Sequence, residues 1–275
     1  MKISGKTNIC VIIGDPVDHS LSPAMHNAAY EALGIDDEFV FVASHVKVED
    51  VKHVVQAVRV MGISGLTCTI PHKLKVMQYL DAVDPIAAKI GAVNTVVNDS
   101  GILRGYNTDW LGTVMPLEHE IGSLKGKSVA LVGAGGAARA MAYGVIEKGA
   151  HLTIVNRTLA KAKELAEELE VEINVTTFDD MKSHIPEHDI ILNATSLGMG
   201  EQMNQTPIPK EFIRKNQIVF DAVYSPRETR LLKEAKERGA KTIQGVEMLL
   251  YQGIAQFELY TGREAPIDVM RKVLE

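Results

Sequence analysis

The feature that most constrains the fold is an apolar run that leads directly into a glycine-rich turn and then into a helical stretch. Residues 128–132 (SVALV) have the pattern of a buried strand, and Gly133, Ala134, Gly135, Gly136 and Ala137 follow without a break. The first glycine permits a tight turn, and Gly135 lets the backbone approach a pyrophosphate. The helix beyond presents free N–H groups and a partial positive charge to the phosphates. This order predicts a dinucleotide-binding turn, with a purely structural turn as the alternative.

The next apolar run, His151 to Val155, ends at Asn156-Arg157-Thr158, which indicates which dinucleotide is bound. An NAD enzyme usually carries Asp or Glu here, on the ribose 2′-hydroxyl. Arg157 instead offers a fork of donors that suits a 2′-phosphate, and Asn156 and Thr158 add neutral donors. The sequence therefore favours NADP, unless Arg157 is merely an exposed residue at a strand end.

Short β-branched runs alternate with helical stretches along all 275 residues, which predicts an α/β fold with parallel sheets. We expect two domains. The first, residues 1–109, is an α/β domain, and the second, residues 110–244, is a Rossmann-type parallel-sheet domain that binds the dinucleotide. In the first block we expect a helix after Pro71 and a hairpin at Asn98-Asp99-Ser100-Gly101.

Composition limits the partners. The net charge of −6 argues against nucleic acid, and no stretch approaches the roughly 20 apolar residues of a membrane helix. The first residues lack a signal-peptide run, and two cysteines are too few for a disulfide framework, so we expect a cytoplasmic protein. The nine histidines lack metal-ligand spacing, so no metal is expected. Small molecules remain the expected partners.

Polar residues cluster where the first strands end. Ser20 and Ser22 flank one apolar residue just before Pro23 and a predicted helix, an arrangement that suits a carboxylate, although Ser22 could simply cap that helix. Thr69 ends another strand, and we expect Lys73 in the first turn of the helix after Pro71. The positive end of a helix dipole opposes the charge of a lysine and tends to lower its pKa, which suits an amine that transfers a proton. The alternative is an exposed surface lysine.

These motifs, taken in order, resemble the shikimate dehydrogenase family over nearly the whole chain. Each motif is modest alone, but their shared order is specific. The matching stretches are Gly14-Asp15-Pro16, Ser20-Leu21-Ser22-Pro23, Thr69-Ile70-Pro71-His72-Lys73, Gly91-Ala92-Val93-Asn94-Thr95, Asn107-Thr108-Asp109, Gly133-Ala134-Gly135-Gly136-Ala137, Asn156-Arg157-Thr158, Asn193-Ala194-Thr195-Ser196-Leu197-Gly198-Met199, Asp221-Ala222-Val223-Tyr224-Ser225-Pro226 and Gly245-Val246-Glu247-Met248-Leu249 with Gln252.

The resemblance implies NADP-dependent, reversible reduction of 3-dehydroshikimate to shikimate. It implies a catalytic pair, Lys73 and Asp109, that moves a proton at the C3 oxygen as hydride moves to or from nicotinamide C4. It also implies that residues 245–275 fold back to complete the first, substrate-binding domain. For the substrate, the resemblance implies that Ser20 and Ser22 bind the carboxylate with Tyr224 nearby, and that Thr69, Asn94 and Gln252 bind the hydroxyls. For the cofactor, it implies that Arg157 binds the 2′-phosphate and that Thr195 and Met199 line the cleft. The backbone at Val223 and Gly245 would contact the nicotinamide amide.

Two alternatives stay open: a quinate/shikimate dehydrogenase that uses NAD, and a non-catalytic nucleotide-sensing module. Arg157 disfavours the first, and the presence of Lys73 and Asp109 disfavours the second. Trp110 and Tyr260 depart from the family pattern, which commonly has Gly and Trp there, and Trp110 could alter the hinge between the domains. A monomer and a homodimer fit the sequence equally well.

Overall fold

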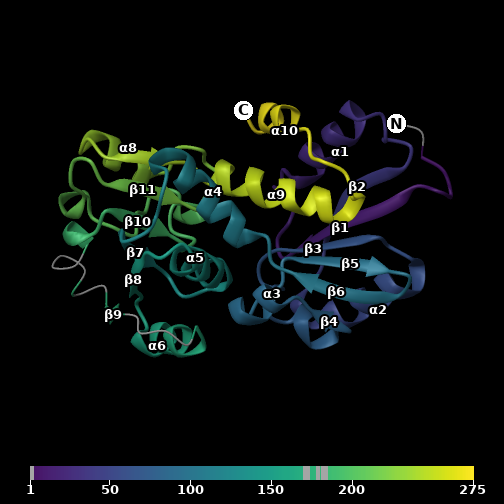
Figure 1. Ribbon diagram of the computed structural model, residues 1–275, viewed down its shortest axis with the longest axis horizontal. Coiled ribbons are helices and arrows are strands. Elements are labelled where there is room, and N and C mark those ends of the chain that lie inside the picture. The colour runs from purple at the N-terminus through teal and green to yellow at the C-terminus, as the bar shows by residue number, and fades with distance from the viewer. Residues whose placement is uncertain (1–2, 170–173, 178–179, 181–184) are drawn as a thin grey trace. The chain divides into compact units, whose positions relative to one another are not determined.

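The chain forms two compact units, each built on one six-stranded sheet (Figure 1). The computed structural model describes residues 3–169, 174–177, 180 and 185–275. Unit 1 comprises Met1–Thr108 and Gln252–Glu275, and unit 2 comprises Asp109–Tyr251. Sheets flanked by helices in both units confirm the α/β fold class. The ligand assigned to each domain, and the limits 1–109 with 245–275 and 110–244, stay predictions.

The sheet of unit 1 is mixed, with the strand order β2-β1-β3-β5-β6-β4. Strand β1 pairs in parallel with β2 and β3, whereas β5 runs antiparallel to β3 and β6. Ser100 and Gly101 have positive φ angles of 54° and 94° in the β5–β6 turn, which confirms the expected hairpin. The elements before the division of the chain are β1 Asn8–Gly14, α1 Ser22–Ala32, β2 Phe39–His45, α2 Val51–Met61, β3 Gly65–Cys68, β4 Ala82–Val83, α3 Pro85–Ile90, β5 Thr95–Asp99 and β6 Ile102–Tyr106.

Helices cover both faces of this sheet. On one face the apolar stripe Val51, Val55 and Val58 of α2 packs against β1, β3 and β5. On the other face lie α1 and the last segment of the chain, which contributes the part of α9 (Gly245–Thr261) from Gln252 onward and α10 (Ile267–Leu274) (Figure 1). Gly253 lies so close to α1 that a β-carbon there would stand 2.2 Å from Cε of Met25. The C-terminal segment is therefore part of the core of unit 1.

An aromatic cluster under this face contains a buried histidine. His26 stacks on Phe41 with ring centroids 4.3 Å apart, and Tyr30, Phe257 and Tyr260 surround it. Neither ring nitrogen has a hydrogen-bond partner among the described residues. Burial disfavours the imidazolium and lowers the pKa of His26 to about 3, an effect that the Gln256 side chain opposes in part. His26 is therefore neutral in the folded protein.

This neutral histidine predicts a loss of stability in acid. In the unfolded chain His26 binds a proton below pH 6.5, whereas in the folded chain it does so only near pH 3. The contribution of neutral His26 to the free energy of unfolding should therefore be fully present above pH 6.5. Below that pH the free energy of unfolding should fall by up to about 1.4 kcal/mol per pH unit. Urea unfolding at pH 7 and pH 5 should show this loss, and His26→Phe should reduce it by about 2 kcal/mol. The control is His151→Gln, at an exposed site; equal pH dependence in His26→Phe and wild type would contradict the prediction.

The sheet of unit 2 is parallel throughout, with the order β12-β11-β10-β7-β8-β9. This order confirms a Rossmann-type sheet. The short edge strands β9 and β12 were not predicted, because neither has the continuous apolar run of the central strands. The elements are α4 Asp109–Ile121, β7 Ser128–Val132, α5 Gly136–Glu147, β8 His151–Val155, α6 Leu159–Glu168, β9 Asn174–Thr176, β10 Ile190–Asn193, β11 Ile218–Asp221, α8 Arg230–Glu237 and β12 Lys241–Ile243.

Alternate side chains of the central strands enter two separate cores. Val129 and Leu131 of β7 pack with α4, α5 and α6, while Ala130 and Val132 pack with Leu231 and Leu232 of α8. Both faces of the parallel sheet are thus buried, which explains why its strands are continuous apolar runs.

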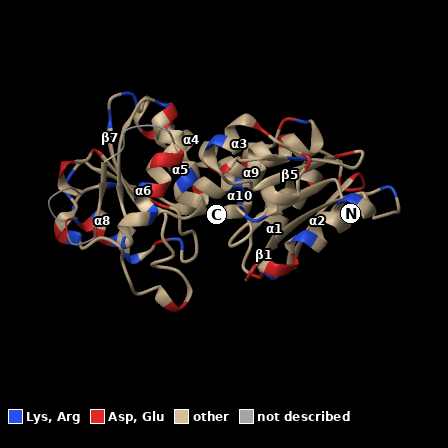
Figure 2. Ribbon diagram, turned by 90° about the horizontal axis from the view of Figure 1, so that it is seen from below, with Lys and Arg blue, Asp and Glu red and all other residues tan. Residues whose placement is uncertain are grey.

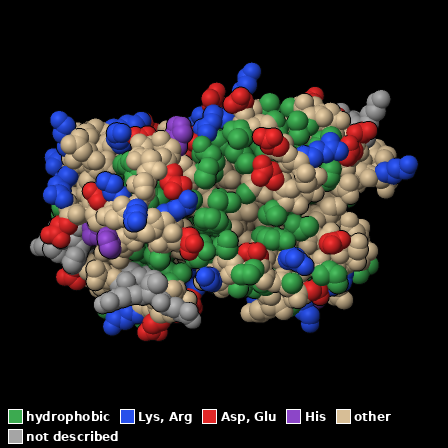
Figure 3. All heavy atoms as spheres, in the orientation of Figure 1, with side chains coloured by type: hydrophobic (Ala, Val, Ile, Leu, Met, Phe, Trp, Pro, Cys, Tyr) green, Lys and Arg blue, Asp and Glu red, His purple; other side chains and the backbone are tan. Residues whose placement is uncertain are grey.

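The surface carries charges of both signs. Lys and Arg are interspersed with Asp and Glu along the ribbon, and the face in Figure 3 shows the same mixture (Figures 2 and 3). Within the part of the chain that the structure describes, no helix is long and apolar enough to cross a bilayer.

Candidate functional site

The glycine-rich turn of unit 2 has the geometry that a dinucleotide requires. Gly133 has φ 116°, and a β-carbon there would lie 3.2 Å from the backbone of Ala194, so only glycine fits without strain. Gly135 directly precedes α5, and the space around its missing β-carbon is empty within 4 Å. The free N–H groups of the first turn of α5, from Gly136 and Ala137, are available to phosphate oxygens. These residues therefore fit a pyrophosphate.

This turn lies where the strand order of the sheet reverses. From β7 the chain continues to β8 and β9 on one side, and β10, β11 and β12 lie on the other. In open α/β sheets ligands bind at the carboxyl ends of the strands at this point. The loop after β10 lies against the glycine turn, since Thr195 Cγ2 stands 3.3 Å from the β-carbon position of Gly133. Half-buried Met199 ends the same loop.

A buried polar network, which the sequence analysis did not identify, fixes the two loops beside this point. Asn193 Oδ1 accepts hydrogen bonds from the backbone N–H and the hydroxyl of Thr195, at 3.0 and 2.7 Å. Asn193 Nδ2 donates to Asp221 Oδ1 at 2.8 Å, and the Asp221 carboxyl also accepts from Val223 N and from Thr229 Oγ1. Burial raises the pKa of Asp221, and these three donors oppose that rise. Polar residues at the ends of two buried strands were the available signal.

The loop after β11 approaches the start of α9 backbone to backbone. A β-carbon on Gly245 would stand 2.6 Å from the carbonyl of Val223, so a side chain there would displace one of the two segments. The structure thus brings together Val223 and Gly245. Tyr224 follows, and burial raises the pKa of its phenol.

Arg157 lies beyond the end of β8, beside the glycine turn in the sheet. Its side chain is exposed and forms no hydrogen bond or ion pair with any described residue. Asn156 uses its amide to donate to Thr158 O at 2.8 Å, so that donor shapes the loop rather than pointing into solvent. Arg139 of α5, by contrast, is paired with Glu168. Arg157 is therefore available to an anionic ligand.

Several candidate substrate residues of unit 1 follow strands β1 and β3 in the chain. Thr69, just after β3, lies against Gly14 at the end of β1, where a β-carbon would stand 2.6 Å from Thr69 Cγ2. Ser20 accepts a hydrogen bond from Ser22 N at 3.3 Å. Ser22 is the first residue of α1 and caps no N–H group, because the N-cap position is held by Leu21. The capping alternative for Ser22 is therefore wrong.

Lys73 does not begin a helix, which corrects the expectation from sequence. Residues 71–75 form turns, followed by a short 3-10 segment, Val76–Tyr79. The carbonyl of Lys73 accepts from Val93 N at 2.9 Å, a contact outside any helix. Lys73 therefore does not stand at the N-terminus of an α-helix, and no helix dipole acts on its charge. Its side chain is half-buried, near the thiol of Cys68.

His72 anchors the turn that carries Lys73. Its ring is fully buried, and Nε2 lies 2.8 Å from Val46 O, so Nε2 carries the proton and donates. Burial lowers the pKa of His72. Nothing in the sequence indicates a role for this histidine, because its contact with Val46 is one that no local pattern reveals.

Asn94 and Gln252 meet in the same unit. Asn94 Nδ2 donates to Thr108 Oγ1 at 2.9 Å and lies 3.5 Å from Gln252 Oε1, and both side chains are buried. Asp109, the first residue of α4, is buried and belongs to unit 2. Its pairing with Lys73 stays a prediction.

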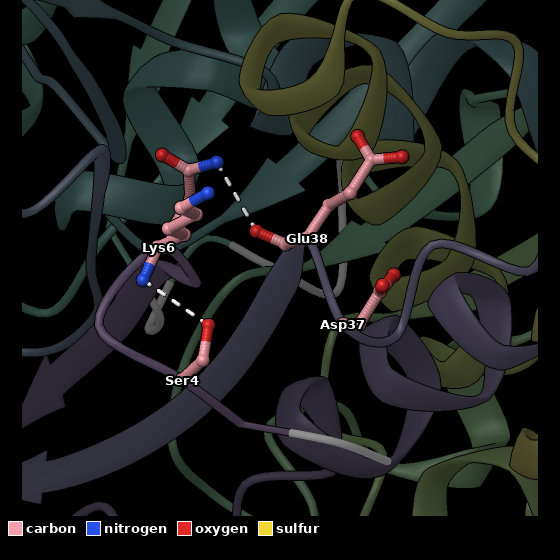
Figure 4. Close-up of a pocket in the computed structure, with 5 residues that line it drawn as sticks. Ser4, Lys6, Asp37 and Glu38 are labelled. Carbon is pink, nitrogen blue, oxygen red and sulfur yellow. Dashed lines mark hydrogen bonds between the residues drawn. The ribbon is translucent and has the colours of Figure 1, made fainter.

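A depression lies at the amino-terminal edge of the unit 1 strands. It has a volume of about 410 Å³, and Ser4, Lys6, Asn8, Asp37 and Glu38 line it (Figure 4). Asn8 Nδ2 donates to Glu38 O there, and the Glu38 carboxylate is paired with Arg263 at 2.7 Å. None of the predicted site residues lines it. Among the described residues no group of three or more His, Cys, Asp or Glu could hold a metal ion.

Three family models match the chain in sequence order. Residues 12–96 match the shikimate dehydrogenase substrate binding domain, residues 117–199 match shikimate/quinate 5-dehydrogenase, and residues 245–275 match the shikimate 5′-dehydrogenase C-terminal domain. A curated relative from Methanocaldococcus jannaschii, named shikimate dehydrogenase (NADP(+)), is 44% identical over 99% of this chain and 98% of its own.

Solved structures with the same fold include two with different nucleotides. A shikimate dehydrogenase in complex with NADP+ has a TM-score of 0.92 at 42% identity, over 99% of this chain and 96% of its own. A quinate dehydrogenase from Corynebacterium glutamicum in complex with NAD has a TM-score of 0.89 at 32% identity, over 97% of this chain and 98% of its own.

Proposed function

The chain belongs to the shikimate dehydrogenase family, and on this basis we propose that it catalyses the reversible NADP-dependent reduction of 3-dehydroshikimate to shikimate. One observation supports this most: Thr69, just after β3, lies against Gly14 at the end of β1, and unit 2 carries an intact dinucleotide turn. Ser20 and Lys73 follow the same two strands in the chain, and hydroxyls with an amine suit a polyhydroxylated acid.

The proposed chemistry needs one hydride and one proton. Bound NADPH supplies the hydride from nicotinamide C4. Lys73 delivers a proton to the C3 oxygen as the carbonyl becomes an alcohol, and it takes that proton back in the reverse direction. Asp109 holds the Lys73 ammonium in position. Because Lys73 and Asp109 would titrate as a coupled pair, the transferable proton is assigned to the pair and not to one of the two residues.

Binding is divided between the two units in this proposal. Ser20 and Ser22 bind the carboxylate, with Tyr224 near it, and Thr69, Asn94 and Gln252 hold the ring hydroxyls. The cofactor residues are Gly133, Ala134, Gly135, Gly136 and Ala137 at the pyrophosphate, Asn156, Arg157 and Thr158 at the 2′-phosphate, Thr195 and Met199 along the cleft, and Val223 and Gly245 at the nicotinamide amide.

We place the enzyme in the cytoplasm, as a monomer or homodimer. Cys10 and Cys68 are both unpaired and buried, and burial raises the pKa of each thiol to about 12. Such thiols remain protonated and unreactive, which suits a reducing compartment.

The test compares initial rates of nucleotide reduction with shikimate and quinate, each offered NADP and NAD. The proposal expects shikimate with NADP to give the highest kcat/KM. The solved structure of a quinate dehydrogenase with NAD makes quinate oxidation with NAD the second candidate function. Equal or faster turnover of quinate with NAD would favour this second function. Inactivity in all four mixtures, with NADP binding retained, would favour a sensing module.

A further inference from the structure

A chain of buried side chains in unit 1 leads from the aromatic cluster to the predicted substrate residues. Gln256 of α9 donates from Nε2 to Thr95 Oγ1 at 2.9 Å. Thr95 Oγ1 donates to Asn94 Oδ1 at 2.8 Å. All three side chains are at most 1% exposed, so no water competes for these bonds. Gln256 is thereby linked to Asn94 through a single hydroxyl.

A backbone group fixes the direction of this chain. The N–H of Thr108 donates to Asn94 Oδ1 at 2.9 Å, which identifies that atom as the amide oxygen. Thr95 has one hydroxyl proton, which it donates to the same oxygen, and the Tyr260 hydroxyl also lies near it. Thr95 then accepts from Gln256, which presents its –NH₂ group.

The other end of Gln256 supports this orientation. Gln256 Oε1 and both nitrogens of His26 are buried without a hydrogen-bond partner among the described residues. The Gln256 side chain lies near enough to His26 to influence its titration. A neutral imidazole carries one N–H donor, which complements an amide oxygen and not a second –NH₂ group. The two links from Gln256 through Thr95 to Asn94 thus each have a donor facing an acceptor, and the Gln256 oxygen is left on the side of His26.

We infer that Gln256 is a positioning residue, which acts through the Thr95 hydroxyl to hold the Asn94 amide with its –NH₂ group toward the substrate. The inference rests on the proposed function, in which Asn94 binds a ring hydroxyl. Asn94 Nδ2 donates to Thr108 Oγ1 at 2.9 Å and lies 3.5 Å from Oε1 of Gln252, the other amide proposed to hold a ring hydroxyl. In this orientation Nδ2, and not Oδ1, lies on the side of Gln252. If the amide turned over, its oxygen would lie on that side and lose both present donors.

Gln256→Met keeps the length of the side chain and removes the donor. We expect the KM for shikimate to rise about 5- to 30-fold, with the KM for NADP within about twofold, because a lost hydrogen bond to an uncharged group has this order of effect. Tyr30→Phe is the matched control: it removes from the same core a buried hydroxyl that lies near Cys10 and takes no part in the chain from Gln256 to Asn94. It should leave both KM values unchanged, and circular dichroism should show that each variant is folded.

Two further variants separate positioning from general stability. Thr95→Val should reproduce the rise in KM, and Thr95→Ser, which keeps the hydroxyl, should restore it. In the double variant Gln256→Met/Thr95→Val the KM for shikimate should equal that of the worse single variant, because both changes break one chain. An unchanged KM in folded Gln256→Met, or effects that multiply in the double variant, would overturn the role of Gln256. Inactivity of the wild type with shikimate would overturn the proposed function as well.

Discussion

Replacement of Lys73 by alanine is expected to lower kcat for shikimate oxidation by roughly 10²- to 10⁴-fold, the usual contribution of a general acid–base group. The side chain of Lys73 is half-buried near the thiol of Cys68, on a turn that His72 and Val93 hold by hydrogen bonds. A turn fixed in this way should keep its shape when the side chain is shortened. Steady-state rates at saturating NADP measure the loss, and fluorescence titration should give a wild-type Kd for NADPH.

Lys75→Ala provides the matched control for this prediction. Lys75 lies in the same turn, and its ammonium stands 5.9 Å from the ring centre of Tyr79. Its removal should change kcat less than twofold. Lys73→Arg should remain inactive, since a guanidinium does not release its proton near neutral pH. A kcat within tenfold of wild type in Lys73→Ala would refute the catalytic assignment.

Arg157→Ala should raise the KM for NADP by roughly 10- to 150-fold, because each charge-assisted hydrogen bond contributes about 1.5–3 kcal/mol. Arg157 has no competing partner among the described residues, so its donors are free for the 2′-phosphate. NAD lacks that phosphate, and its KM should change less than threefold. The measurement is kcat/KM for both nucleotides at fixed shikimate.

The control for Arg157 is Arg214→Ala, which removes an exposed arginine from the same unit. It should leave both nucleotides unaffected. Equal weakening of NADP and NAD in Arg157→Ala would mean that the side chain supports the loop after β8 and does not distinguish the two nucleotides.

Local chemistry made part of this site predictable. A positive φ at Gly133 is a property of one residue, and the strand and helix on either side have their own patterns, so the turn could be located from sequence. The hairpin at Ser100 and Gly101 was predictable for the same reason. In both places the backbone conformation depends on residues adjacent in the chain.

Lys73 shows where local reasoning fails. Its segment follows a proline and carries helix-forming residues, yet its carbonyl bonds the N–H of Val93. That bond exists only because β3 and the segment before β5 are neighbours in the sheet. Ser22 is similar: a serine before a proline is a common cap, but Leu21 takes that position. At both residues the local conformation depends on tertiary contacts and not on the neighbouring sequence.

The partners of the supporting residues could not be identified from sequence. His72 contacts Val46, Asn193 contacts Asp221, and Gln256 contacts Thr95, and each pair is far apart in the chain. A polar residue in an apolar run signals that some partner exists, but the partner is known only once the elements are packed.

Unit 1 is built from the first and the last segments of the chain, and this has a consequence for its synthesis on the ribosome. Phe257, Tyr260 and Met270 all come from the last segment, and they fill the face of the sheet that α1 shares. Unit 2 is continuous in sequence and can close while translation proceeds. The first segment of unit 1 emerges first, and that face of its sheet stays uncovered until the final helices leave the exit tunnel. The first part of the chain to be made is therefore the last to be finished, and it is the part most in need of protection from aggregation during synthesis.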